Sequence, residues 1–332
     1  MTTTLSLGCW DYDRVKAILD GRVGVDGFRL KPTVMTPTDI FARAFTEAPF
    51  DVSELSLSSY MLQVARGTCA YVAIPVFLSR AFRHGGIFVR ADRGIRKPKD
   101  LESRLVGVPE YQMTMAMWVR GILQDEYGVA FRKIQWRTGG LAKPGRKERL
   151  ALDLPAAMDV KPIGPSDTLD GLLMAGDLDA VVAPATPPSF AAGDTRVARL
   201  FADPAAEERA YYKKTGMFPI MHVVGLRRTI AAENPKLPVA LFHAFVKARD
   251  LALGELRATA AASANRLTLP WFAAEWEATR ALMGDRVWSY GVPDNMRELR
   301  AACRYSSEQS LAPRRLAVDE LFHPATGNLA DA

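Results

Sequence analysis

Short runs of apolar residues alternate along the chain with longer stretches whose apolar residues recur every three or four positions. The short runs are typical of buried strands and the longer stretches of amphipathic helices, so their alternation predicts an α/β fold. Strands are expected at residues 5–9, 28–30, 50–52, 72–77, 87–90, 105–109, 134–136 and 178–184. Helices are expected at residues 14–19, 38–48, 112–127 and 169–175, and from Ser58 onward.

The C-terminal third has a different pattern. Three amphipathic helices are expected there, at residues 238–256, 270–283 and 296–309, and the residues after Phe322 are expected to fray. At 332 residues the chain exceeds the size of most single cores, which favours two domains. A charged turn at residues 92–101 marks the start of a second α/β unit.

Composition and charge exclude several classes of protein. The formal net charge is +6, but the basic residues are interspersed with acidic ones, and no basic block with interleaved aromatic residues indicates nucleic-acid binding. A small anionic ligand suits this mild excess. No apolar stretch reaches the ~20 residues of a membrane span, and the first residues lack the features of a secretion signal, so we expect a cytoplasmic protein without a membrane partner. Cys9, Cys69 and Cys303 are far apart and are expected to be buried thiols.

The order of motifs resembles a known fold. An Asp-x-Asp pair after the first strand (Asp11 and Asp13), two α/β units and a helical tail resemble the two-lobed type II periplasmic-binding-protein-like fold. Segments spread along nearly the whole chain resemble more closely the 4,5-dihydroxyphthalate decarboxylase family, and their joint occurrence makes the resemblance specific. These segments are residues 11–14, 51–60, 74–84, 107–114, 118–123, 138–141 and 218–222.

This resemblance implies both an architecture and an activity. Lobe one would comprise residues 1–92 and 220–332, including the helical extension, and lobe two residues 93–219, with central mixed sheets and a substrate cleft between the lobes. The family implies a cytoplasmic carboxy-lyase that needs no cofactor and converts 4,5-dihydroxyphthalate to protocatechuate in phthalate catabolism. A ring hydroxyl para to the carboxylate-bearing carbon makes that carbon basic. The protein must then supply a proton donor, a partner for the hydroxyl and a clamp for the retained carboxylate.

Three residues within the family-like segments are the catalytic candidates. His84 is the preferred proton donor, Glu110 the base for the hydroxyl, and His222 a second acid–base or orienting group, because imidazole titrates near neutral pH. The alternative for His222 is a core histidine, and for Glu110 a carboxylate that caps the following helix. These three residues could ligate a divalent ion, but their spacing matches no metal motif, and we expect no metal.

Substrate-binding candidates share chemistry that suits carboxylates or hydroxyls. Arginine binds carboxylates through two parallel hydrogen bonds, and helix N-termini offer free N–H groups. The candidates are Arg14, Glu54, Ser56, Ser58, Arg80, Arg83, Tyr111, Gln112, Thr114, Thr138, Gly139 and Arg146. Ser58 could equally be an ordinary helix cap, and an individual arginine is more often a solvated surface group. Trp10, Tyr111 and Trp118 could form an aromatic wall, with Trp118 better suited to the core.

Other functions share this fold. A binding protein that only captures an aromatic or heterocyclic acid is the main alternative, and the lack of a recognisable signal segment argues against it. An enzyme of pyrimidine or thiamine-precursor chemistry would need different cleft motifs. The effector domain of a regulator would follow a helix-turn-helix, which does not precede the first strand here. The expected partner is a small aromatic mono- or dicarboxylate, and a homo-oligomer is left open.

Overall fold

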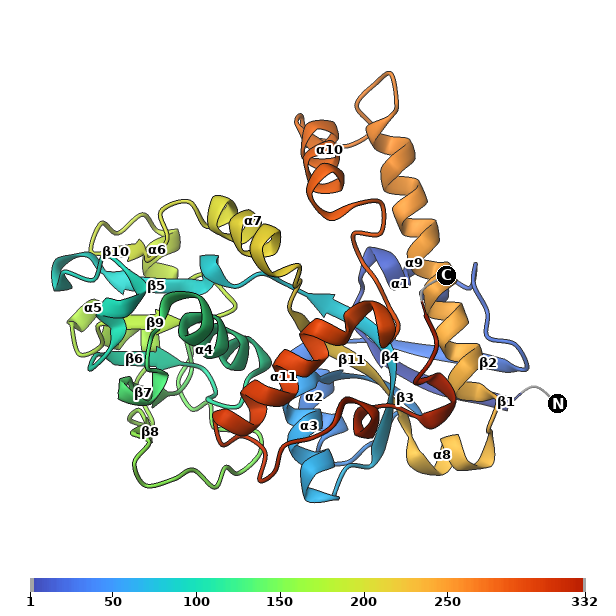
Figure 1. The fold of residues 1–332 in the computed structure, drawn as a ribbon, viewed down its shortest axis with the longest axis horizontal. Helices are drawn as coiled ribbons and strands as arrows, with labels where there is room; N and C mark the ends of the chain where they lie inside the picture. The colour runs from blue at the N-terminus through green and yellow to red at the C-terminus, as the bar shows by residue number, and fades with distance from the viewer. Residues whose placement is uncertain (1–2, 331–332) are drawn as a thin grey trace.

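Two mixed β-sheets form the centres of two lobes in the computed structural model, which describes residues 3–330 (Figure 1). The first sheet has the strand order β2-β1-β3-β11-β4 and the second β10-β5-β9-β6-β7-β8. The strands of the first sheet are β1 (Thr3–Cys9), β2 (Phe28–Val34), β3 (Val52–Ser56), β4 (Tyr71–Arg80) and β11 (Ile220–Arg227). Those of the second are β5 (Ile87–Arg90), β6 (Leu105–Val108), β7 (Gln135–Thr138), β8 (Val160–Pro162), β9 (Ala180–Val182) and β10 (Val197–Arg199). The predicted α/β class is confirmed.

Strand direction follows from the connections. β1 runs parallel to β2 and β3, whereas β11 returns antiparallel between β3 and β4. In the second sheet β6 runs parallel to β7 and β9, and β5 is antiparallel to β9 and β10. Pro32, Pro75 and Pro162 lie in β2, β4 and β8, which are edge strands, so their missing N–H groups interrupt no ladder.

The chain crosses between the lobes twice. It leaves the first sheet at Arg80 and enters the second at Ile87, earlier than the boundary expected at residue 92. It returns through α7 (Pro204–Thr215) to β11, which begins at Ile220. The two crossing segments lie side by side, since the backbone N–H of Ala81 donates to the carbonyl of Pro219 at 3.1 Å.

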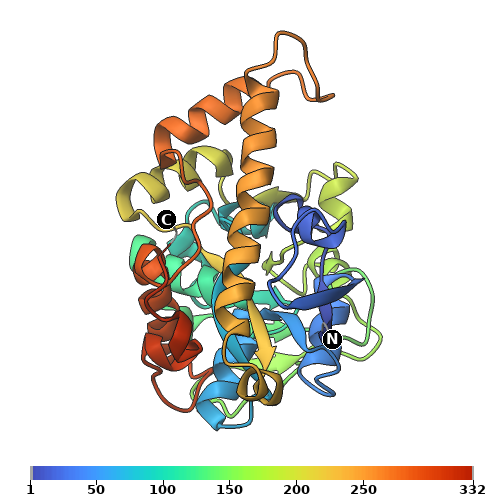
Figure 2. The ribbon, with the colours of Figure 1, turned by 90° about the vertical axis from the view of Figure 1, so that its right-hand side faces the viewer.

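Helices cover both sheets. They are α1 (Asp13–Leu19), α2 (Pro37–Ala44), α3 (Leu57–Arg66), α4 (Thr114–Tyr127), α5 (Leu169–Ala175), α6 (Pro188–Ala191), α8 (Arg228–Glu233), α9 (Leu237–Ala260), α10 (Phe272–Met283) and α11 (Met296–Glu308), in addition to α7. The long helix α9 runs along the outside of lobe one against α1 (Figure 2), and its far end projects with α10 away from both lobes (Figure 1).

Helix α11 connects the lobes. It starts beside lobe one, where the backbone N–H of Gly291 donates to the carbonyl of Pro75 at 2.8 Å, and it then packs on α3 and α4. The ring of Tyr305 lies directly on Gly121 of α4, where a Cβ atom would come within 2.4 Å of it. Just after α11, the side chain of Gln309 accepts a hydrogen bond from Nε of the fully buried Arg120 at 2.8 Å. This interface is therefore closely packed and shielded from water.

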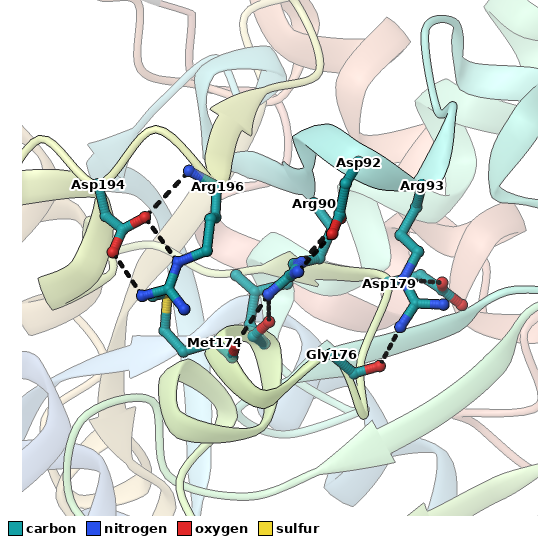
Figure 3. A network of polar contacts seen from close by, with 9 residues as sticks. Arg90, Asp92, Arg93, Met174, Gly176, Asp179, Asp194 and Arg196 are labelled. Carbon is teal, nitrogen blue, oxygen red and sulfur yellow. Dashed lines mark hydrogen bonds and ion pairs between the residues drawn. The ribbon is translucent and has the colours of Figure 1, made fainter.

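An arginine-rich network closes one end of lobe two (Figure 3). Arg90, at the end of β5, donates to the carbonyls of Leu173 (3.1 Å) and Met174 (2.8 Å) and pairs with Asp92. Arg93 donates to the carbonyl of Gly176 at 2.6 Å. Cations at a helix C-terminus complement the helix dipole, so these arginines anchor α5 rather than form a binding surface.

The terminal segments complete lobe one. The backbone N–H of His323 donates to the carbonyl of Ala73 at 2.8 Å, and Phe322 and Thr326 are buried. The expectation of fraying after Phe322 is therefore wrong for the residues up to 330, because this segment covers the edge of β4; residues 331–332 lie outside the described part. Within residues 3–330, none of the helices combines the length and the apolar character that crossing a bilayer requires. The three cysteines are free and buried, as expected.

Candidate active site

A cavity of about 260 Å³ lies between the lobes, close to the lower end of the range for small-ligand pockets, about 300 Å³. Lobe one contributes the segment after β1, the start of α2, the ends of β3 and β4, and β11. Lobe two contributes the segment before α4, the loop between β7 and β8, and the residue after β9. The lining residues are Trp10, Tyr12, Pro37, Thr38, Phe41, Ser56, Ser79, Arg83, Met113, Thr114, Met115, Arg146, Arg149, Pro184, Met221 and His222.

His222 contributes an imidazole to the wall of this cavity. It lies on β11 opposite Ser56 of β3, and its Nδ1 is 2.6 Å from Oε1 of the fully buried Glu54. Glu54 also accepts from the hydroxyl of Tyr12 at 2.7 Å and from the backbone N–H of Trp10 at 3.0 Å. A carboxylate beside Nδ1 holds the proton on that nitrogen, so Nε2 is the nitrogen left for a ligand. Burial and the nearby Glu54 charge raise the pKa of Tyr12, which therefore stays a hydroxyl donor.

Arg83 lines the same cavity as His222. Its Nε is 3.3 Å from Sδ of Met221, and no carboxylate among residues 3–330 forms an ion pair with it. Burial lowers the pKa of Arg83 to about 10, which still leaves the guanidinium charged at neutral pH. Glu208 acts on the guanidinium only from beyond ion-pair distance, so a bound carboxylate would gain a partner there. Arg83 is therefore a candidate anion-binding group of the cavity.

Two further arginines enter from lobe two. Arg146 and Arg149 both donate to Oε1 of Glu110, at 2.5 and 3.1 Å, while Oε2 of Glu110 is buried without a partner in the described part. One carboxylate thus faces two guanidinium groups, which leaves a net positive charge at this wall. Arg149 lies over the ring of Phe41, whose other neighbour is the edge of His222. Phe41 therefore separates the histidine from this pair of cations.

Two helices begin at the cavity. Ser56 precedes α3 in lobe one, and Thr114 opens α4 in lobe two; their hydroxyl oxygens are 2.9 Å apart. Thr114 Oγ1 also accepts from the backbone N–H of Ser58 at 3.0 Å. The first N–H groups of a helix have no intrahelical acceptor and carry positive partial charge, which favours anions. Both predicted helix starts are thus at the lobe interface, and Ser56 and Thr114 line the cavity.

The structure places His84 elsewhere. Its ring lies behind the cavity wall among Tyr127, Phe201 and Tyr211, and neither ring nitrogen has a hydrogen-bond partner within residues 3–330. Burial lowers its pKa to about 4, so it is neutral at pH 7. The geometry does not favour His84 as the proton donor, a role that stays a prediction: Arg83 lines the cavity, whereas the next side chain packs among aromatic residues of lobe two.

Glu110 is close to the cavity but does not line it. Its side chain is 3% exposed and is occupied by Arg146 and Arg149, so this arrangement does not favour its expected role as a free base for a substrate hydroxyl, which stays a prediction. Glu110 instead fixes the two arginines.

Two predicted arginines have structural roles. Arg14 donates to the carbonyl of Leu78 through Nε at 2.7 Å and stacks on Trp288. Arg80 is buried; it donates to the carbonyl of Phe218 at 2.7 Å and also binds the side chain of Asn295. Neither guanidinium lines the cavity, because each is turned toward the C-terminal segments that cover lobe one.

The remaining candidates support the cavity wall from behind. The hydroxyl of Ser58 and the ring of Tyr111 are buried, and Gln112 is fully buried between α3 and the loop after β7. Thr138 and Gly139 end β7 without reaching the cavity. Trp10 lines the cavity, whereas Trp118 donates to the carbonyl of Ile220 at 2.9 Å and belongs to the core. No group of three His, Cys, Asp or Glu side chains among residues 3–330 is arranged to hold a metal ion.

Comparisons with known proteins agree with this architecture. The chain is 42% identical over 322 residues to the 4,5-dihydroxyphthalate decarboxylase of Comamonas testosteroni, and the match covers 97% of both chains. The chain belongs to the 4,5-dihydroxyphthalate decarboxylase family. The protein of the same name from Pseudomonas putida is 42% identical over 209 residues, which cover 63% of this chain and 81% of that protein. No family model matches the sequence.

Solved structures show the fold of this decarboxylase family member. The aliphatic sulphonate-binding protein SsuA of Escherichia coli superposes with a TM-score of 0.55 at 12% identity, covering 98% of this chain and 99% of that one. The alkanesulfonate-binding protein SsuA of Xanthomonas axonopodis pv. citri has a TM-score of 0.51 at 12% identity and covers 97% and 98%. The predicted type II periplasmic-binding-protein-like fold is confirmed.

Several cavity residues escaped prediction. Tyr12 lies within the family-like segment 11–14, so the motif contained the signal, although Arg14 was selected from it. Arg149 lies three residues after Arg146 in a loop, where no helical or strand period indicates which side chains share a face. Phe41 and Met221 looked like ordinary core residues in the sequence, and only the packing of α2 and β11 brings them to the cavity.

Proposed function

We propose that this protein decarboxylates 4,5-dihydroxyphthalate to protocatechuate (3,4-dihydroxybenzoate) without an organic cofactor. The observation that carries the proposal is His222, which is bonded to the buried Glu54 and lines the same small cavity as Arg83, a guanidinium with no carboxylate in ion-pair distance among residues 3–330. An acid–base group and an unneutralised cation at one wall suit protonation of an anionic aromatic ring. The family relationship supplies the substrate class.

In this proposal His222 moves the proton. Protonated His222 donates its Nε2 proton to the ring carbon that bears the departing carboxylate, and the hydroxyl para to that carbon supplies the electron pair for the new C–H bond. The bond between ring and carboxylate then breaks, its electrons return to the ring, and carbon dioxide leaves. One proton is consumed for each carbon dioxide, and solvent reprotonates the imidazole. The carboxylate of Glu54 stabilises the imidazolium and fixes the ring orientation.

The cations hold the substrate in place. Arg83 and the pair Arg146 and Arg149 enter from different sides of the cavity, which suits an acid with two adjacent carboxylates. The hydroxyls of Ser56 and Thr114 are the proposed hydrogen-bond partners of the ring hydroxyls. Because 4,5-dihydroxyphthalate is symmetric, loss of either carboxylate yields the same product. Orientation therefore matters only for bringing one ring carbon to His222.

Capture of an aromatic acid without turnover is the second candidate, favoured by the likeness to sulfonate-binding proteins. A single assay separates the two: chelator-treated protein is mixed with 4,5-dihydroxyphthalate, and carbon dioxide and protocatechuate are measured. Turnover that is lost in His222→Gln supports the proposal. Binding without product favours capture. The cytoplasmic location stays a prediction, to be tested by cell fractionation, and the oligomeric state is open to direct measurement by light scattering.

A further inference from the structure

The loop that carries Arg146 and Arg149 has no regular structure of its own. Residues 139–159 connect β7 to β8 and contain no helix or strand. Arginine side chains on such a loop would ordinarily sample many conformations, and ordering each one costs about 2 kcal/mol. A site that uses both guanidinium groups therefore needs something to fix the loop.

Glu148, which lies between the two arginines in sequence, points in a different direction. Its carboxylate accepts hydrogen bonds from the backbone N–H groups of Tyr111 and Gln112, the latter at 3.3 Å. These two residues immediately precede the cavity-lining residues Met113 and Thr114. Glu148 thus joins the arginine loop to the backbone that leads into α4.

Gln112 completes the connection in the opposite direction. With its amide oriented to satisfy both ends, the oxygen accepts from the backbone N–H groups of Arg149 (3.0 Å) and Leu150 (2.6 Å), and the nitrogen donates to the hydroxyl of Ser59 (3.1 Å). Each segment therefore provides a side chain that binds two consecutive N–H groups of the other. Such reciprocal bonds define the position of the loop more closely than the Glu110 ion pairs alone.

The charges around Glu148 indicate a site that is built rather than incidental. Burial, followed by the nearby Glu110 charge, raises the pKa of Glu148 to about 7, and the backbone bonds from Tyr111 and Gln112 together with Arg120 oppose that rise. Both carboxylate oxygens of Glu148 are used, one by each of the two backbone N–H groups.

We propose that Glu148 is a positioning residue for substrate binding: it fixes the 139–159 loop so that Arg146 and Arg149 both present their guanidinium groups to the cavity. This proposal relies on the proposed function only for the identity of the substrate. The binding of an aromatic dicarboxylate can be tested whether or not the protein catalyses the proposed reaction. Glu148 touches neither the cavity nor the substrate, and it acts through the two arginines.

The test uses phthalate, an aromatic ortho-dicarboxylate that lacks the hydroxyls needed for turnover. Its dissociation constant is measured by titration calorimetry with the full-length protein, its Glu148→Ala and Glu148→Gln variants, and the matched control Glu233→Gln on the exposed surface of α8. We expect phthalate affinity to fall about tenfold in Glu148→Ala and less in Glu148→Gln, which keeps one acceptor oxygen. For 4,5-dihydroxyphthalate, KM should rise by a similar factor while kcat changes less than about threefold.

A second background separates positioning from general stability. In the double variant Arg146→Ala/Arg149→Ala, adding Glu148→Ala should change phthalate affinity less than about twofold, because the groups through which it acts are gone. An equal loss in both backgrounds, or unchanged phthalate affinity in Glu148→Ala, overturns the inference. Should Glu148→Ala not fold, Glu148→Gln provides the same comparison. If wild-type protein binds phthalate through Glu148 but never releases carbon dioxide, the proposed reaction fails while this inference stands.

Discussion

Replacing His84 by phenylalanine should change the pH dependence of stability and leave catalysis intact. The imidazole lies in an aromatic environment with neither nitrogen bonded in the described part of the chain, and burial lowers its pKa to about 4. In the unfolded chain a histidine has its ordinary pKa of about 6.5. Between these two values the unfolded state binds a proton that the folded state does not bind. The contribution of neutral His84 to the free energy of unfolding is therefore fully present above pH 6.5 and is lost as the pH falls toward 4.

The size of this effect follows from the two pKa values. The full difference corresponds to about 3 kcal/mol, of which about 2 kcal/mol falls between pH 7 and pH 5. In the wild type, two buried ring nitrogens lack hydrogen-bond partners, and each such unsatisfied group costs about 1 kcal/mol or more. The phenyl ring of the variant removes this cost at pH 7. We expect His84→Phe to be at least as stable as the wild type at pH 7. At pH 5 its advantage should be about 2 kcal/mol larger.

Urea unfolding followed by tryptophan fluorescence at pH 5, 6, 7 and 8 measures this directly. The quantity of interest is the difference in unfolding free energy between variant and wild type, in which the other titrating groups cancel. His243→Gln, at an exposed position of α9, serves as the matched control. A pH-independent difference for His84→Phe would refute the reasoning, and a large loss of kcat would return His84 to the catalytic machinery.

Three further predictions concern the site and its support. His222→Gln should lower kcat by at least about 100-fold with little change in KM, and Glu54→Gln should also lower kcat. An unchanged kcat for either variant in steady-state kinetics would contradict the proposed proton transfer. Arg83→Ala should raise KM at least about tenfold, whereas Arg257→Ala on the exposed surface of α9 should not; equal effects would place the anion site elsewhere. Arg120→Met should destabilise the fold by about 2–4 kcal/mol in urea unfolding, since it leaves two buried acceptors unpaired, and a neutral result would show that this charge is dispensable.

Strands with long apolar runs that are buried on both faces could be predicted even at the edge of a sheet. β4 is the clearest example, with almost every residue buried. The edge strands β8 and β10 were missed because each has three residues and is partly exposed, so no alternation develops. α7 was missed because Tyr211 is its one buried residue, which leaves no apolar stripe for a helical period to reveal.

The site was predictable only as far as motifs extend. His222, Ser56 and Thr114 lie in family-like segments and do line the cavity. The choice between His84 and His222 could not be made from sequence, because Arg83 and His84 lie in the connection between β4 and β5, where no strand or helix period indicates which side chain faces the cavity. The arginines were over-predicted for a related reason: Arg80 satisfies carbonyls of the C-terminal segments, which are distant in sequence.

The packing of α11 across both lobes limits how this protein can exchange its ligand. Binding proteins of this general design admit ligand by a hinge motion that swings the lobes apart. Here such a motion would break the hydrogen bond between Arg120 and Gln309 and separate the ring of Tyr305 from Gly121, which would expose their buried contact surface to water. Entry and exit should instead depend on small local displacements at the rim of the cavity. The groups that line the cavity from both lobes would then stay together between one ligand and the next.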